Sequence, residues 1–131
     1  MLLLFVLAAL LMNSAATAEP TGDEDREIRH LLDYLESSGC QFFRNGKWYN
    51  DMKTVRGHAE RKLRYFADKG RVHSAEDFID LAASRSELSG KPYLVKCGEG
   101  PAKTSAQWLK EELDRYRKGE STPATRQQPR K

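Results

Sequence analysis

The sequence predicts one α+β domain, with a small three-stranded antiparallel sheet and helices packed mainly on one of its faces. Three observations lead to this class: segments with apolar residues at helical spacing, an Asn-Gly pair between aromatic runs, and a short apolar run that ends at a cysteine. In chain order the expected elements are α-β-β-α-α-β-α. We expect a signal peptide over residues 1–18, the domain over 19–118, and a disordered tail rich in Ser, Pro, Gln and charge over 119–131.

The first helix is predicted to begin near residues 23–25, which are all acidic and therefore favour a helix N-terminus. Apolar residues follow at positions i, i+3, i+4 and i+7, which gives the helix one apolar face: Ile28, Leu31, Leu32 and Leu35. The small and flexible residues 37–39, Ser-Ser-Gly, are expected to end it.

A β-hairpin is predicted around Asn45-Gly46, because a type I′ turn needs positive φ at both central residues. This turn pairs Arg44 with Lys47, Phe43 with Trp48, and Phe42 with Tyr49. Alternation then puts one set of side chains on each face: Phe42, Arg44, Lys47 and Tyr49 on one, Phe43 and Trp48 on the other. Since both faces carry an aromatic pair, the pattern leaves open which face packs on the core.

Three further elements follow the hairpin. A second helix begins after Asn50 or Asp51, ends near Asp68, and has an apolar stripe: Met52, Val55, Ala59, Leu63 and Phe66. A third helix is capped by Ser74, with Asp77 completing a capping box, and its buried candidates are Phe78, Ile79, Leu81 and Ala82. Residues 93–97 predict the third strand.

A last helix is expected to start at Thr104-Ser105. Its apolar positions are Trp108, Leu109, Leu113 and Tyr116.

The N-terminal residues are typical of an export signal. An apolar run over residues 1–12 precedes Ala16-Thr17-Ala18, a small-x-small cleavage site, so we expect a periplasmic protein. The run is shorter than the roughly 20 residues that a membrane-spanning helix needs. No cysteine stands at the cleavage point, which argues against a lipoprotein anchor, and we expect the processed chain to be soluble and monomeric.

Cys40 and Cys97 are predicted to form a disulfide, because an oxidising compartment leaves two cysteines one intramolecular pairing. The bridge would join the third strand to the start of the hairpin. The alternative, a reactive thiol, lacks a Cys-x-x-Cys motif or a recognisable Cys/His nucleophile signature.

Charge and histidine spacing exclude several classes of function. The chain has 22 basic and 19 acidic residues, and these are interspersed, so the net charge of +3 does not indicate nucleic-acid binding. His30, His58 and His73 lack the spacing of metal ligands. We expect neither a metal nor a cofactor.

The hairpin tip is the first candidate binding surface. Arg44 and Lys47 flank the turn, with Trp48 and Tyr49 just behind it, and aromatic rings beside cations suit a glycan, an anionic group or a protein partner. In the alternative, the rings pack and the charges keep the turn soluble.

His58 is the second candidate, since helical projection places Asp51, Lys62 and Tyr65 on its side of the second helix. It is either a general base or a boundary histidine with one structural hydrogen bond. We therefore expect a non-enzymatic binding or accessory protein of the envelope, whose partner is an envelope protein or glycan. The alternatives are a small hydrolase that uses His58 with a nearby Ser, Asp or Tyr, and an inhibitor that plugs a cell-wall enzyme with the hairpin.

Five stretches follow one another in a fixed order: 38–46 (Ser-Gly-Cys-Gln-Phe-Phe-Arg-Asn-Gly), 58–65, 75–79, 89–97, and Trp108-Leu109 with Tyr116-Arg117. This series resembles the YfeK-like family, small exported proteins of Gram-negative bacteria defined by a domain of unknown function. The resemblance covers about residues 26–117. It implies a periplasmic location and a single domain, without an activity or cofactor. The residues that match its characteristic stretches are Arg44, Asn45, Gly46, His58, Ser89, Gly90 and Tyr93.

Overall fold

Four helices and four strands make up the part of the chain that the computed structural model describes, residues 22–120. In order they are α1 (Gly22–Ser37), β1 (Gln41–Arg44), β2 (Lys47–Tyr49), α2 (Met52–Asp68), α3 (Ala75–Ala82), β3 (Leu94–Lys96), β4 (Lys103–Thr104) and α4 (Ser105–Arg117). The α+β class is as predicted. The predicted signal peptide, 1–18, and residues 121–131 of the predicted tail lie outside the described residues.

The sheet has four antiparallel strands in the order β2-β1-β3-β4, so the predicted count of three was wrong. The missed strand, β4, is only two residues long and pairs Thr104 with Leu94 and Lys103 with Val95. A strand this short shows no alternation of apolar and polar residues, and α4 begins at the very next residue. It therefore has no pattern of its own in the sequence.

The hairpin forms with the predicted register and turn. Phe42 is opposite Tyr49, and Asn45 and Gly46 have φ values of 50° and 81°, the positive pair that a type I′ turn requires. The structure also shows which face packs on the core: Phe42 is 4 % exposed, whereas Trp48 is 39 % exposed. Phe43 pairs with Trp48 on the outer face, their ring centroids 5.1 Å apart.

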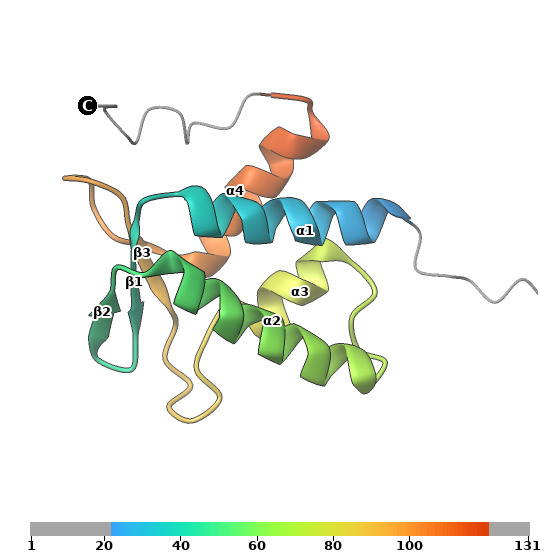
Figure 1. Ribbon diagram of the computed structural model, residues 1–131, viewed down its shortest axis with the longest axis horizontal. Coiled ribbons are helices and arrows are strands. Elements are labelled where there is room, and N and C mark those ends of the chain that lie inside the picture. Colours follow the sequence, from blue (N-terminus) through green and yellow to red (C-terminus); the bar gives the residue numbers. More distant parts are fainter. Residues whose placement is uncertain (1–21, 121–131) are drawn as a thin grey trace, which may run out of the picture.

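The helices pack around α1, which contacts each of the other three. Figure 1 shows the strands gathered at one end of α1, with α2 and α3 lying along it and α4 crossing behind. The predicted caps are present, because the side chain of Asp51 accepts from the amides of α2 and that of Ser74 accepts from Asp77. The core is formed by the apolar faces of all four helices together with Phe42, Tyr93 and Val95.

Three residues of the predicted apolar stripes are less buried than expected. Leu63 and Leu81 are half-buried, and Tyr116 is 37 % exposed. The ring of Tyr116 stacks on His30 of α1, with 4.1 Å between the ring centroids. Leu63 packs against the core from its edge, so both it and Tyr116 contact protein and also meet solvent.

The predicted disulfide is present. Cys40 and Cys97 are joined by an S–S bond of 2.04 Å, with 4.4 Å between their Cα atoms. Cys40 directly precedes β1 and Cys97 directly follows β3, and Gln41 and Lys96 are the adjacent partners of the ladder. The bond therefore fixes one end of the β1–β3 pair, at the base of the hairpin.

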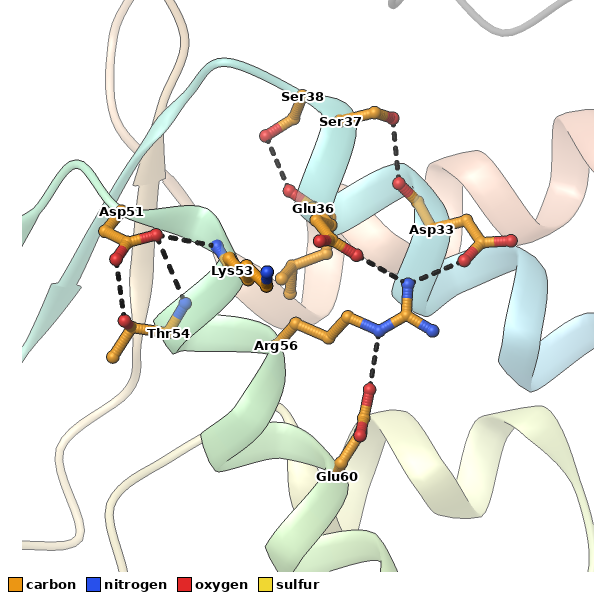
Figure 2. Close-up of polar contacts among 10 residues, drawn as sticks. Asp33, Glu36, Ser37, Ser38, Asp51, Lys53, Thr54, Arg56 and Glu60 are labelled. Atoms are coloured by element: carbon orange, nitrogen blue, oxygen red, sulfur yellow. Dashed lines mark hydrogen bonds and ion pairs between the residues drawn. The ribbon is translucent and has the colours of Figure 1, made fainter.

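A single arginine fixes α2 against α1. The guanidinium of Arg56 lies 2.6 Å from the carboxylate of Asp33, 2.8 Å from that of Glu36 and 2.5 Å from that of Glu60. Figure 2 shows it between the two helices, with Asp51, the N-cap of α2, at the start of that helix. Hydrogen bonds to these carboxylates raise the pKa of Arg56 above its usual value. This cluster links α2 to α1 two residues before His58.

Candidate functional site

The hairpin, α2 and the loop over residues 84–92 meet around Arg44. This residue ends β1, and its Nη1 lies 3.3 Å from Nε2 of His58 on α2. The loop is fastened to the hairpin turn, because Ser89 Oγ donates a hydrogen bond to Asn45 Oδ1 at 3.0 Å. The hairpin tip, His58 and the serine-rich loop, which the sequence separates, are thus neighbours in the fold.

A hollow of about 280 Å³ opens beside Arg44, and we call it the basic hollow. Its walls come from β1, from the second half of α2 and from the loop. The lining residues are Arg44, Lys62, Tyr65, Phe66, Ser86, Glu87, Leu88 and Tyr93. Two of these side chains, Arg44 and Lys62, are cations, and one, Glu87, is an anion.

Lys62 is held in place at the wall of the basic hollow. Its Nζ donates to the backbone oxygen of Arg85 at 2.8 Å and to the hydroxyl of Tyr93 at 3.3 Å, and it lies 5.2 Å from the centroid of that ring. The carboxylate of Glu87 is 3.8 Å from Nζ and its side chain is 61 % exposed. The lysine is thus oriented by two neutral acceptors, and its ion pair with Glu87 is long and solvent-accessible.

His58 lies between two guanidinium groups. Its Nε2 contacts Arg44, and its Nδ1 contacts Arg61, one turn further along α2. Partial burial lowers the pKa of His58 below the ordinary value of 6.5, and the two arginines lower it further. The ring is therefore neutral at pH 7. A neutral imidazole has one N–H and one lone pair, so it can accept a hydrogen bond from only one of its two arginine neighbours.

This environment differs from the one that the hydrolase alternative requires of His58. A general base needs one ring nitrogen facing the proton that it removes and a group that orients the other nitrogen, and here both contacts are with cations. Asp51 does not join His58, because its carboxylate accepts from the amides of Lys53 and Thr54 at the start of α2. Tyr65 and Lys62 line the basic hollow, but His58 does not.

A second, narrower cavity lies on the inner side of Arg44, under the hairpin. It has a volume of about 20 Å³, and its walls include Phe42, Tyr49, Val55 and His58. That volume holds about one water molecule and is too small for a ligand. Arg44 borders both spaces, and within residues 22–120 its buried Nε has no hydrogen-bond partner.

The five residues predicted for binding are thus placed differently. Arg44 borders the basic hollow, and His58 contacts Arg44 without lining the hollow itself. Tyr49 lines the narrow cavity, and the Nζ of Lys47 lies 5.2 Å from its ring centroid. Lys47 and Trp48 do not line the basic hollow.

Sequence reasoning missed three residues of this region: Arg61, Glu87 and Leu88. Arg61 could have been found, because it is three positions after His58 on the same helix and such residues are neighbours on a helix surface. Glu87 and Leu88 carry no such signal, since only the fold of the loop brings them to α2.

Residues 22–120 contain neither a cluster of metal ligands nor a membrane-spanning helix. No group of three His, Cys, Asp or Glu side chains in this range could hold a metal ion. No helix in the same range is both long and apolar enough to cross a membrane.

The match to known proteins covers the whole of this region. Residues 22–117 match the family described as "Family of unknown function (DUF5329)". The chain belongs to this family. The chain is also similar to "Uncharacterized protein YfeK" of Salmonella typhimurium strain LT2. The two are 33 % identical over 88 residues, which are 66 % of this chain and 71 % of that protein. The resemblance to YfeK-like proteins is thereby confirmed. Among solved structures, none matches the chain.

Both cysteines and every residue that lines the basic hollow lie inside the matched range, 22–117. The hollow is therefore part of the family domain and not of a segment added outside it.

Proposed function

We propose that the chain is an exported, non-enzymatic binding or accessory protein of the Gram-negative envelope, and that it contacts an envelope protein or glycan through the hairpin tip and the basic hollow. One observation carries the proposal: Arg44 stands at the edge of an open hollow, and no carboxylate within residues 22–120 pairs with it. A cation fixed in this way is available to a partner.

Export is supported by the apolar run and small-residue cleavage site in residues 1–18. The disulfide between Cys40 and Cys97 also supports it, because structural disulfides persist in oxidising compartments such as the periplasm. Fractionation of Gram-negative cells that express the chain tests this point. We expect a processed form in the periplasmic fraction, and an unprocessed form retained in the cytoplasm would contradict export.

The surroundings of His58 favour binding over hydrolysis. Both of its ring nitrogens contact arginines, so the ring is not oriented to take a proton from a serine or a water molecule.

Capture of envelope material tests the binding role. The processed protein is immobilised, exposed to envelope proteins and glycans, and compared with the double variant Arg44→Ala/Trp48→Ala. We expect material that free wild-type protein competes away and that the double variant loses. Arg29→Ala is the matched control, because Arg29 is an exposed arginine on α1 that does not line the hollow. Equal capture by the wild type and the double variant would show that the surface is wrong.

A further inference from the structure

We propose that the basic hollow is a binding site for a carboxylate or phosphate group attached to a small apolar body. The inference rests on the proposed function and gives the ligand chemistry of the same surface. It is carried by the charge around the hollow, by hydrogen-bond donors that lack acceptors, and by exposed apolar walls.

The charge is unbalanced at this place. Arg44, Arg61 and Lys62 gather where the hairpin meets α2, and within the described part of the chain no carboxylate forms an ion pair with either arginine. Glu87 alone reaches the lysine, at 3.8 Å, and its side chain is 61 % exposed. An exposed pair of this length contributes little, so an incoming anion can displace it.

The donors at this place also outnumber the acceptors. Two guanidinium groups share the single lone pair of neutral His58, which leaves one arginine facing an N–H. Lys62 has three N–H donors, of which two have neutral acceptors within hydrogen-bond distance. An anion between Arg44 and Lys62 would accept charge-assisted hydrogen bonds from the guanidinium group of Arg44 and from the third N–H of Lys62.

Two exposed apolar or aromatic side chains form part of the remaining wall. Leu88 is 92 % exposed and Tyr65 is 57 % exposed, and both border the hollow beside the ring of Tyr93. A volume of about 280 Å³ lies at the lower end of the range for small-molecule sites. The hollow therefore fits a small aromatic or aliphatic group, or the end of a longer chain, that carries its charge at one end.

Titration with four probes tests the proposal: benzoate, phenyl phosphate, inorganic phosphate and the neutral benzamide. Binding is followed by calorimetry and by backbone amide NMR of the purified protein. We expect benzoate and phenyl phosphate to shift the resonances of residues that line the hollow, and benzamide to bind at least about tenfold more weakly, since a hydrogen bond to a charged group is lost. Weaker binding of inorganic phosphate than of phenyl phosphate would show the contribution of the apolar walls.

Two substitutions are expected to act in opposite directions. Arg44→Gln should weaken benzoate binding by about tenfold or more, and Glu87→Gln should strengthen it, because the competing carboxylate is removed. Glu87 is exposed, so this variant remains informative if Arg44→Gln unfolds. Arg29→Gln, the matched control on α1, should leave the affinity within about twofold, because Arg29 is exposed and does not line the hollow.

Equal affinity for benzoate and benzamide, or the absence of binding by either anionic probe, would overturn the proposal. Unchanged affinity in both Arg44→Gln and Glu87→Gln would do the same. These outcomes are separate from failure of the proposed function. If Arg44→Ala/Trp48→Ala loses capture but no anionic probe binds, the proposed binding surface is retained and only the proposed ligand chemistry is wrong.

Discussion

The contribution of the disulfide to stability can be predicted from the loop that it closes. Cys40 and Cys97 are 57 positions apart, and in the chain-entropy model a loop of this size stabilises the folded state by about 4 kcal/mol. A domain of this length has a free energy of unfolding of roughly 5–15 kcal/mol in total. Loss of the bond should therefore remove a large share of the stability and leave a fold that is still populated.

Urea denaturation followed by circular dichroism measures this contribution. Oxidised wild-type protein is compared with the same protein after reduction and with Cys40→Ala/Cys97→Ala. Reduction isolates the bond, because it changes no other atom of the chain. We expect the free energy of unfolding to fall by about 4 kcal/mol. The dependence on urea should become steeper, since the unfolded chain without the cross-link exposes more surface.

Two results would refute this reasoning. One is a loss of less than about 1 kcal/mol on reduction, which would mean that the unfolded chain is not constrained as the entropy model requires. The other is the titration of about two free thiols per chain in native, non-reduced protein.

Three further predictions concern charged and titrating groups. Arg56→Ala should lower the free energy of unfolding by about 1–2 kcal/mol in chemical denaturation, because three partly exposed ion pairs are lost, two between α1 and α2 and one within α2. Burial, with the carboxylate of Glu112, raises the pKa of Tyr34 to about 12, so tyrosinate absorbance should show one late-titrating group. Stability should fall as pH rises from 10 towards 12, since the unfolded chain ionises first. Because the pKa of His58 is lowered in the folded state, its contribution to stability is present above pH 6.5 and is lost as the pH falls through the pKa of the folded state. Arg44→Gln should raise the pKa of His58 in an NMR titration, because one of the two nearby positive charges is removed.

Much of the fold could be predicted because its signals are local. The turn at Asn45-Gly46 depends on two residues, and the cap at Ser74 on four, so short stretches of sequence contain the whole pattern. Prediction of the disulfide required only that the chain has two cysteines and that its expected compartment is oxidising. The strand β4 was missed for the opposite reason, since its two residues are defined by pairing with β3 and not by a pattern.

The choice of hairpin face could not be predicted, because it depends on a residue far along the chain. Phe42 is buried under Tyr93, with 5.1 Å between the ring centroids, and that residue follows the loop over 84–92. The basic hollow had no signal for the same reason. Arg44, Lys62 and Leu88 lie in three separate segments, and only the folded loop brings them together.

The position of Asp51 shows how a helical projection can mislead. Projection places Asp51 on the side of His58. In the structure Asp51 is the N-cap of α2, and its carboxylate accepts hydrogen bonds from two backbone amides at the start of that helix. The cap contact is local and charge-assisted, so it takes precedence over a longer contact along the helix.

The covalent ring closed by Cys40 and Cys97 has a further consequence for proteolysis. Every residue that lines the basic hollow lies inside this ring, whereas α1 and α4 lie outside it and pack on each other. The exposed side chain of Leu88 marks the loop over 84–92 as a place where a protease would cut. One cut there opens the ring but releases no fragment, because the two new ends remain connected through the sulfur bridge. Two cuts, or one cut with reduction, are needed to separate the walls of the hollow from the rest of the protein.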